Sequence, residues 1–354
     1  MFLVSEEFLS STHGSLGCIT CHGGKNEPDK QVAHSGMQPY PSRDFNATCA
    51  ECHSDVTDTF SSSIHFTLAG MSNGLLEFTN YGALAESPHH EEVFNNDCYK
   101  CHATCGDCHV SRPKNYSQGL VAEHTFFDTP PMDETCYGCH NARNAGEFMG
   151  KVGFSGDVHY SNGMTCMDCH QIDNFHGSGS QAANMWEENL PTCIGCHQDK
   201  DPAVASDSFH SVHGDSLSCQ VCHAQASNNC FECHLDPNDE GKLASSSQTR
   251  LMFRIGYNPE ITEERPYKYV VLRHVPTQAS MLEVVEDDML PNFDQKSNWK
   301  YSPTHNIQRS TFQNESCESC HDNTRIWLRL EDLRETDSKD NQRLIPELPP
   351  PLGH

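Results

Sequence analysis

Two Cys-x-x-Cys-His units almost touch at residues 98–109, which read Cys-Tyr-Lys-Cys-His-Ala-Thr-Cys-Gly-Asp-Cys-His. This motif attaches a c-type haem: the two cysteines bond covalently to the porphyrin, and the adjacent histidine ligates the iron. Only two residues separate the two units, so the pattern predicts two porphyrins that lie against one another. Such an arrangement is suited to passing electrons.

All twenty cysteines of the chain lie in such motifs, and none is left over. The ten motifs, numbered 1 to 10 in chain order, are Cys18/Cys21/His22, Cys49/Cys52/His53, Cys98/Cys101/His102, Cys105/Cys108/His109, Cys136/Cys139/His140, Cys166/Cys169/His170, Cys193/Cys196/His197, Cys219/Cys222/His223, Cys230/Cys233/His234 and Cys317/Cys320/His321. Zinc ribbons and disulfides also use paired cysteines. Neither explains a histidine directly after the second cysteine in all ten pairs. The sequence therefore predicts ten covalently attached c-type haems.

The composition is too polar for a conventional hydrophobic core, because only 36% of the 354 residues are apolar. Ten haems would supply broad apolar faces around which the polypeptide wraps. We therefore expect a haem-dominated fold with little regular secondary structure, in which short α-helices and loops surround a chain of haems. We also expect that the chain does not fold without haem, because attachment and ligation supply what apolar burial cannot.

The formal net charge of −26 argues against nucleic acid as a partner. Redox partner proteins, extracellular electron acceptors or further copies of the chain are the expected partners, and charge would steer their encounter. No run of about 18 apolar residues occurs, so we expect no transmembrane segment. The opening Met1–Leu9 is too short and too acidic for a signal peptide. Because haem c is attached outside the cytoplasm, we expect an exported protein, periplasmic or extracellular, whose export signal is removed or not shown.

The spacing of the motifs divides the chain into four segments. Residues 1–97 form an N-terminal segment with two haems, and residues 98–234 form a dense core with seven. Residues 235–316 contain no motif, and residues 317–354 contain the last haem and a proline-rich tail. The flanking sequence does not repeat with the motifs, so a solenoid of identical units is not expected. We expect short helices at or just after several motifs.

The haem-poor segment predicts a small β element. Residues 250–257 and 267–275 are rich in β-branched and aromatic residues, and Pro259 and Pro266 mark the connection between them. We expect two strands that pack on the haems.

Three other segments carry structural signals. Residues 64–78 have mixed apolar character and predict a short helix or a loop packed on a haem. Residues 325–333 predict a short amphipathic helix. The tail 344–354, Leu-Ile-Pro-Glu-Leu-Pro-Pro-Pro-Leu-Gly-His, should run as extended polyproline II, either solvated or laid along a neighbouring subunit.

The second axial ligand of each iron distinguishes a conduit from an enzyme, and thirteen histidines lie outside the motifs. Ten of them would complete ten irons: His13, His34, His65, His90, His124, His159, His176, His213, His274 and His305. This choice takes one histidine from each of two close sets, and it leaves His89, His210 and the terminal His354 undecided. Methionine would raise the potential, but histidine is plentiful enough that the eleven methionines are not required.

Asp157–Gly177, which begins Asp-Val-His-Tyr-Ser-Asn-Gly-Met-Thr-Cys-Met-Asp-Cys-His and ends His-Gly, resembles multihaem cytochromes related to tetrathionate reductase and hydroxylamine oxidoreductase. Residues 209–223 and 299–321 look similar, so the resemblance covers about residues 90–325. It implies the haem-packing architecture but not the reaction. Tetrathionate reductases of this kind carry eight haems and a lysine ligand at the active-site iron, whereas all ten motifs here end in histidine.

These observations favour an electron-transfer protein over an enzyme. Closely packed bis-histidine haems would form an extracytoplasmic respiratory conduit, with room for polymerisation into an extracellular filament. The alternative is a multihaem reductase of a nitrogen or sulfur oxyanion with one open-site haem, for which Arg254, Lys268 and Arg273 are candidate groups. A structural or binding module that uses haem only as a scaffold is a third hypothesis. We assign no catalytic residue.

Overall fold

The computed structural model describes residues 4–113, 119–141, 144–151, 153–225, 227–231, 248–251, 254–283, 285–349 and 352. Cys233, His234 and His354 lie outside these residues, as does part of the tail. By their contacts, the residues divide into two compact units. Unit 1 contains residues 1–71, 93–139 and 166–190, and unit 2 contains residues 72–92, 140–165 and 191–354.

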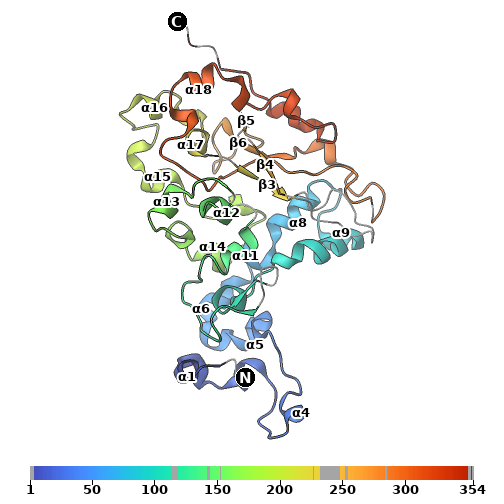
Figure 1. Ribbon diagram of the computed structural model, residues 1–354. Coiled ribbons are helices and arrows are strands. Elements are labelled where there is room, and N and C mark those ends of the chain that lie inside the picture. The colour runs from blue at the N-terminus through green and yellow to red at the C-terminus, as the bar shows by residue number, and fades with distance from the viewer. Residues whose placement is uncertain are drawn as a thin grey trace. The chain divides into compact units, whose positions relative to one another are not determined.

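Unit 1 consists of short helices and loops (Figure 1). Its helices are α1 (Glu6–Ser10), α2 (Thr12–Ser15), α3 (Cys18–His22), α4 (Lys30–Ala33), α5 (Phe45–Thr48), α6 (Ala50–Phe60), α7 (Ile64–Thr67), α10 (Cys105–His109) and α14 (Asp173–His176). The helices α8 (Ala69–Leu76), α9 (Pro88–Val93) and α11 (Cys136–His140) run across the division between the units. Strands β1 (Ser111–Arg112) and β2 (Gly119–Leu120) pair antiparallel. Helices of this length are marginal in water, so neighbouring groups must hold them.

A cluster of three phenylalanines forms the side-chain core of unit 1. The ring of Phe45 lies 5.3 Å from that of Phe60 and 5.5 Å from that of Phe66, and both contacts are edge-on. This is the geometry that aromatic rings prefer. Gly177, directly after α14, has φ +77° and lies so close to α6 that a Cβ would be 2.6 Å from the carbonyl oxygen of Thr59. Only glycine fits this position, and it fixes the end of α14.

Unit 2 contains the larger β structure (Figure 1). Its helices are α12 (Asn144–Phe148), α13 (Val158–Ser161), α15 (Cys193–Cys196), α16 (Ser208–Ser211), α17 (Cys219–His223) and α18 (Glu318–His321). Strands β3 (Ser227–Phe231) and β4 (Gln248–Leu251) pair antiparallel. Strands β5 (Arg254–Tyr257), β6 (Tyr269–His274) and β7 (Trp299–Tyr301) form an antiparallel sheet in the order β5-β6-β7.

The sheet of unit 2 carries the best-packed core. Ile255 of β5 and Val271 of β6 are opposite one another in register and are fully buried. Val221 of α17 and Trp327 pack into the same cluster. The core therefore holds the helix that carries motif 8. Gly256 allows the sheet to close on its neighbours, because a Cβ there would be 2.3 Å from a methyl carbon of Leu272.

The sequence predicted the fold class correctly, since short helices and loops dominate and the sheets are small. The strand predicted at 267–275 is present as β6, but of the strand predicted at 250–257 only residues 254–257 form β5. Residues 250–251 belong to β4, which pairs with β3, and residues 252–253 lie outside the described residues. The sheet also has a third strand, β7, that we did not predict. Residues 64–78 form α7 and α8, with Leu68 in the left-handed region between them. The helix predicted at 325–333 was wrong. Extended residues separate two 3-10 turns, Thr324–Ile326 and Leu330–Asp332.

The described part of the tail lies against its own unit as far as Pro349. Leu344 is fully buried, and the backbone N–H of Glu347 donates to the hydroxyl of Tyr257 at 3.2 Å. A freely solvated tail is therefore wrong for these residues. The division into four segments by motif spacing stays a prediction, because it rests on haem positions.

Candidate functional site: paired histidines at the Cys-x-x-Cys-His motifs

Four motifs fold into single helical turns that place their three side chains together. In α3, α10, α11 and α17 the helix begins at the first cysteine and ends at the histidine. Residues at positions i and i+3 lie on the same helix face, so both cysteines of each motif point the same way. In these four motifs the helix coincides with the Cys-x-x-Cys-His pattern that the sequence shows.

Motifs 2 and 6 disagree with this arrangement, and the difference is at their second cysteines, Cys52 and Cys169. Cys52 lies inside the longer helix α6, which is kinked directly after it, at His53, where φ is −120° and ψ is 39°. Cys169 lies beyond the 3-10 turn Cys166–Asp168 and outside any helix. The expectation was of short helices at or just after several motifs, and these two motifs agree with it: α6 contains Cys52 and His53, and α14 follows motif 6.

Another helix lies close to each of these two motifs along the chain. Helix α5 ends one residue before motif 2, and α14 begins three residues after motif 6. A tight turn nevertheless remains, because the backbone N–H of Cys52 donates to the carbonyl of Cys49 at 3.2 Å, and that of Cys169 donates to Cys166 at 3.3 Å. Attachment of haem at Cys52 and Cys169 stays a prediction.

The cysteine side chains differ in their exposure to solvent. Those that are exposed are Cys18, Cys52, Cys193, Cys196 and Cys317. Those that are partly buried are Cys21, Cys49, Cys101, Cys105, Cys108, Cys136, Cys139, Cys166, Cys169, Cys219, Cys222 and Cys320. Burial thus gives no uniform environment that would mark the second cysteine of a motif.

Six motif histidines lie opposite a histidine from outside the motifs. The pairs, with the distances between ring centroids, are His22–His124 (6.1 Å), His53–His13 (6.1 Å), His109–His176 (6.1 Å), His197–His159 (6.1 Å), His223–His210 (6.2 Å) and His321–His213 (6.2 Å). The first three pairs lie in unit 1 and the last three in unit 2. The rings of His65 and His170 both contact Phe175, with centroid distances of 5.6 Å and 6.2 Å.

The shared distance fits one iron between two imidazoles. An imidazole nitrogen binds a first-row metal at about 2 Å and lies about 1 Å from its ring centroid, so two such ligands place their centroids about 6 Å apart. Rings in direct stacking contact would be closer, as His13 and Phe126 are at 4.1 Å. The donor set and the spacing therefore suit the two axial ligands of a haem iron.

The motif histidines are held in the tautomer that ligates through Nε2. Nδ1 of His22 donates to the carbonyl of Gln38 at 2.7 Å, and Nδ1 of His109 donates to that of Phe127 at 2.6 Å. A carbonyl oxygen can only accept, so Nδ1 carries the proton and Nε2 keeps its lone pair. Hydrogen bonds of this kind fix the orientation of metal-bound histidines and raise their basicity.

Two partner histidines are held by a carboxylate that also caps their helix. Asp157 accepts from the backbone N–H of His159 at 2.7 Å and from its Nδ1 at 2.8 Å. Asp207 does the same for His210, at 3.1 Å and 2.7 Å. Asp is a preferred N-cap residue, so one side chain begins the helix and aims the ring. The hydrogen bond from His210 is the main cause that lowers the pKa of Asp207 to about 2.

Burial favours the neutral, ligating form of several of these rings. Desolvation is the main cause that lowers the pKa of six histidines: His13, His65, His102, His170, His176 and His213. Because a protonated imidazole cannot bind a metal, this shift leaves the nitrogen lone pair available at neutral pH.

Thiols from different motifs lie within hydrogen-bond reach of one another and show which motifs are neighbours. In unit 1, Cys49 pairs with Cys105, Cys101 with Cys139, and Cys136 with Cys166; in unit 2, Cys193 pairs with Cys219. These hydrogen bonds are the main cause that lowers the pKa of Cys49 to about 6 and of Cys136 and Cys219 to about 7. Motif 2 thus neighbours motif 4, motif 5 neighbours motifs 3 and 6, and motif 7 neighbours motif 8. Sequence reasoning could not give this order.

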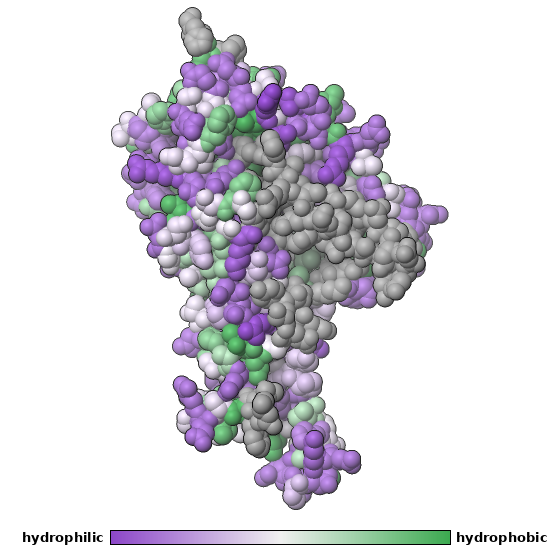
Figure 2. Space-filling view, in the orientation of Figure 1, coloured by the Kyte–Doolittle hydropathy of each residue, from purple (hydrophilic) through white to green (hydrophobic). Residues whose placement is uncertain are grey.

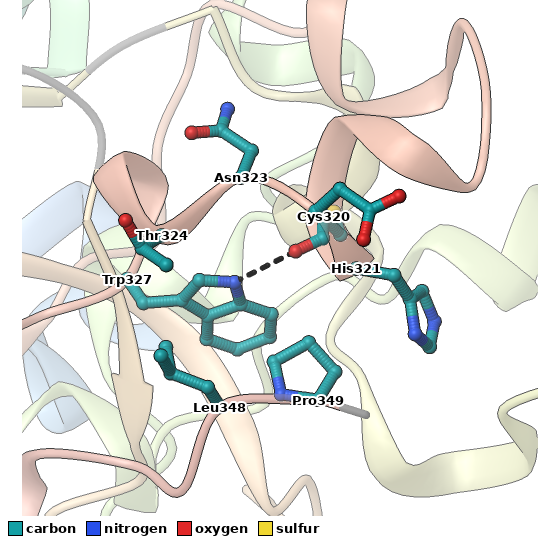
Figure 3. Close-up of a pocket in the computed structure, with 8 residues that line it drawn as sticks. Cys320, His321, Asn323, Thr324, Trp327, Leu348 and Pro349 are labelled. Carbon is teal, nitrogen blue, oxygen red and sulfur yellow. Dashed lines mark hydrogen bonds between the residues drawn. The ribbon is translucent and has the colours of Figure 1, made fainter. Parts of the chain in front are cut away.

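A cavity of about 420 Å³ lies beside motif 10 and is lined by Cys320, His321, Asp322, Asn323, Thr324, Trp327, Leu348 and Pro349. Figure 3 shows Leu348 and Pro349 of the tail beside the indole of Trp327, whose Nε1 donates to the carbonyl of Cys320 at 3.1 Å. The cavity is lined both by Cys320 and His321 of motif 10 and by apolar side chains. Cofactor sites commonly combine such groups.

Apolar side chains are exposed beside several motifs. Ile19 and Ile194, inside motifs 1 and 7, are 46% and 38% exposed. Phe209 and Val212, which precede motif 8, are 67% and 68% exposed. In the coloured part of Figure 2, hydrophilic residues are interspersed with smaller hydrophobic patches. Exposed apolar groups of this kind mark a binding surface, and a porphyrin face would cover them.

Two predicted iron ligands, His90 and His274, make hydrogen bonds inside the protein. These contacts do not agree with the prediction. The ring of His90 is buried; its Nδ1 bonds to the Ser87 hydroxyl at 2.8 Å, and its Nε2 bonds to the Met289 carbonyl at 2.9 Å. His274 is also buried, and its Nε2 bonds to Asp337 at 2.6 Å. Both rings are held in the protein interior by hydrogen bonds at nitrogens that a metal would need.

Three further histidines outside the motifs have contacts with a backbone carbonyl or a carboxylate. His305 donates from Nδ1 to the carbonyl of Pro303 at 2.7 Å, which leaves Nε2 in the ligating form. His34 does the same with Lys30 at 2.6 Å. His89, left undecided by the sequence, is exposed beside Glu286 at 3.6 Å.

Other interpretations of the paired cysteines find no support in the described residues. None of the described cysteines is in a disulfide. No group of three or more His, Cys, Asp or Glu side chains that could hold a metal ion occurs in the same part of the chain. Within it, no helix is long and apolar enough to cross a membrane.

Two family models match parts of the chain. The model for cytochrome c554 and c-prime matches residues 48–118, which contain motifs 2 to 4. The model for cytochrome c3 matches residues 158–237, which contain motifs 6 to 9. No curated protein and no solved structure matched the chain. The matched motifs, with the paired histidines, lead to one conclusion: the chain is a multihaem c-type cytochrome that binds several covalent haems.

Proposed function

We propose that this cytochrome is a decahaem electron conduit in which nearly every iron carries two histidine ligands. The observation that carries the proposal is the repeated distance of 6.1–6.2 Å between a motif histidine and a second histidine. Haem c supplies reversible one-electron exchange at its iron. The chain closes both axial positions with imidazoles, so these sites offer no position at which a substrate could bind.

The contacts support a specific set of ligands. We assign His124 to motif 1, His13 to motif 2, His176 to motif 4, His65 to motif 6, His159 to motif 7, His210 to motif 8 and His213 to motif 10. His210 thus joins the predicted set, and His90 and His274 are structural. His305 stays a proposed ligand without an assigned motif.

The close thiol contacts support conduction through neighbouring sites. Motifs 2 and 4, 3 and 5, and 5 and 6 share such contacts in unit 1. Haem c is attached outside the cytoplasm, so we propose a periplasmic or extracellular place in respiration. Assembly of copies into an extracellular filament is the finer form of this proposal.

A haem count and a spin-state measurement test the conduit. Pyridine haemochrome absorbance per chain should give about ten haems, and the EPR spectrum should be dominated by low-spin ferric signals. Carbon monoxide added after reduction should leave the haems at motifs 1, 2, 4, 6, 7, 8 and 10 unchanged. High-spin signal from several haems would contradict the proposal.

A reductase of a nitrogen or sulfur oxyanion is the second candidate, and one observation favours it. No histidine ring among the described residues lies against His102 of motif 3, so its iron could be open. The cations predicted to serve such a site have other contacts. Arg254 bonds to Asp332 at 2.6 Å, and Lys268 lies over the rings of Tyr257 and Tyr269.

A further inference from the structure

A loop of unit 1 holds His34 away from the chain's other histidines. The loop, residues 23–38, is closed at its base by two hydrogen bonds between His22 and Gln38, each 2.7 Å long. The backbone N–H of Lys25 also donates to the carbonyl of Ala33 at 2.9 Å. In Figure 1, α4 lies at the outer end of this loop, apart from α5 and α6. The loop is therefore built, and it leads outward from motif 1.

His34 has the features of an iron ligand without an iron partner in its own chain. Its Nδ1 donates to the carbonyl of Lys30 at 2.6 Å, as Nδ1 of His22 and His109 does to their carbonyls. Its ring is exposed, and no ring of a described residue contacts it. A surface histidine with no role has no need of such an orientation, because water satisfies both nitrogens.

Exposed apolar side chains surround His34. Val32, Met37 and Tyr40 are 42%, 45% and 46% exposed. Two lysines and two acids within residues 23–38 (Lys25, Lys30, Glu27 and Asp29) cancel, so this loop is neutral on a chain with a net charge of −26. A neutral, partly apolar surface can approach a second acidic chain without the repulsion that the remaining surface imposes.

At motif 3, no second histidine lies opposite the motif histidine among the described residues. The ring of His102 is packed between Tyr99, at 4.6 Å, and Phe66, at 4.9 Å. Among the described residues, no histidine ring lies against it at the distance seen in the six pairs.

We propose that His34 of one copy supplies the second axial ligand to the iron at motif 3 of another copy. This inference rests on the proposed function, because it requires haem at motif 3. The donor and the acceptor are different surfaces of one chain, so the contact is heterologous. Repeated, it produces a ring or an open filament, and each added copy leaves one donor and one acceptor free. The site at motif 3 is complete only in the assembly.

Dilution of the holoprotein separates a ligand from another chain from one in the same chain. Mass photometry would follow assembly, and carbon monoxide binding to the reduced protein would follow open irons. As assemblies dissociate on dilution, the carbon monoxide-binding fraction should rise from near zero to about one haem in ten. A ligand from the same chain would show no dependence on concentration.

The variant His34→Ala should be monomeric and should bind carbon monoxide at about one haem in ten at every concentration. Added imidazole should return that haem to the low-spin state without restoring assembly. The control His89→Ala removes another exposed histidine and should behave as the wild type.

Two results would overturn the inference. The His34→Ala protein could assemble as the wild type and remain low-spin, or the wild type could bind carbon monoxide at one haem regardless of concentration. The second result would support an open-site reductase. In either case a count of ten haems would leave the attachment sites of the proposed function intact, whereas a lower count would contradict that function itself.

Discussion

His210 faces His223 with ring centroids 6.2 Å apart and ring planes inclined by only 15°. His213, three residues further on, instead faces His321 at 6.2 Å. Two histidines three residues apart thus lie opposite the histidines of two different motifs. Under the proposed function, each would complete a different iron.

Replacement of His210 by alanine should open the iron at motif 8. About one haem in ten should become high-spin and bind carbon monoxide, because the opposing imidazole is lost. EPR and the carbon monoxide difference spectrum measure this change. The matched variant His90→Gln should keep every haem low-spin, since His90 bonds to Ser87 and Met289. Open iron in the His90 variant alone would reverse the assignment.

The carboxylate of Asp207 should tune the same site. Its pKa of about 2, caused mainly by the hydrogen bond from His210, keeps it ionised at every pH above about 3. In Asp207→Ala, Nδ1 loses its acceptor, the imidazole becomes less basic, and affinity for the iron should fall about tenfold or more. The potential of one haem should rise, because ferric iron is less stabilised. Spectroelectrochemical titration measures this rise, with the exposed Asp199→Ala as the control.

The Cys-x-x-Cys-His motifs could be identified from the sequence. The histidine that lies opposite each motif histidine could not. Motif 8 folds as one helical turn, α17, and its Cys-x-x-Cys-His pattern is visible in the sequence. The identity of the histidine opposite His223 depends on where α16 packs. Asp207, three residues before His210, was the available signal, because an aspartate at that spacing caps a helix and orients the ring.

Even within the motifs, the sequence did not predict every local conformation. Cys52 and Cys169 have the same motif position as Cys222, yet only Cys222 lies in a helix that coincides with its motif. Helices α5 and α14 lie next to motifs 2 and 6 in the chain. A four-residue spacing carries no information about such neighbours.

The sheet of unit 2 could also be predicted only in part. The β-branched residues around Val271 predicted β6, but β7 has only three residues and carries too little pattern. Residues 325–333 were predicted to form a short amphipathic helix. Instead, the backbone N–H of Leu328 donates to the carbonyl of Ile255 at 2.7 Å, and the segment runs beside β5. Burial of Trp327 and Leu328 decides this conformation.

The buried pair of Asp337 and His274 should stabilise unit 2 without affecting any iron. Burial raises the pKa of Asp337, but the hydrogen bond from His274 and further hydrogen bonds outweigh it and lower the pKa overall. Because the folded-state pKa lies below the unfolded value of about 3.9, this stabilisation is present at neutral pH and is lost as the pH falls below that value.

In Asp337→Ala the buried His274 loses its partner. The free energy of unfolding of unit 2 should fall by about 3 kcal/mol at pH 7, or about 10 °C in Tm. Calorimetry measures this loss, which should shrink in acid. All haems should remain low-spin. A new carbon monoxide-binding haem would show that His274 is a ligand after all.

Removal of haem should affect unit 1 more than unit 2. The helices of unit 1 have eleven residues at most, and isolated helices of this length are marginal. Without haem, exposed apolar groups such as Ile19 remain in water, and three phenylalanines form the remaining side-chain core. In unit 2, Ile255 and Val271 are fully buried by protein alone. The sheet therefore keeps a side-chain core when haem is absent.

Expression without the haem-attachment machinery should therefore give a chain with no cooperative thermal transition by circular dichroism. Limited proteolysis should cut unit 1 first, and any protected fragment should contain β5 to β7. The same gene expressed with haem attachment provides the control. A cooperative transition with unit 1 protected in the haem-free chain would contradict the prediction, because it would mean that side chains alone form the core. Folding would then not depend on haem attachment. We expect that it does, because apolar groups at the motifs stay exposed to water until haem covers them.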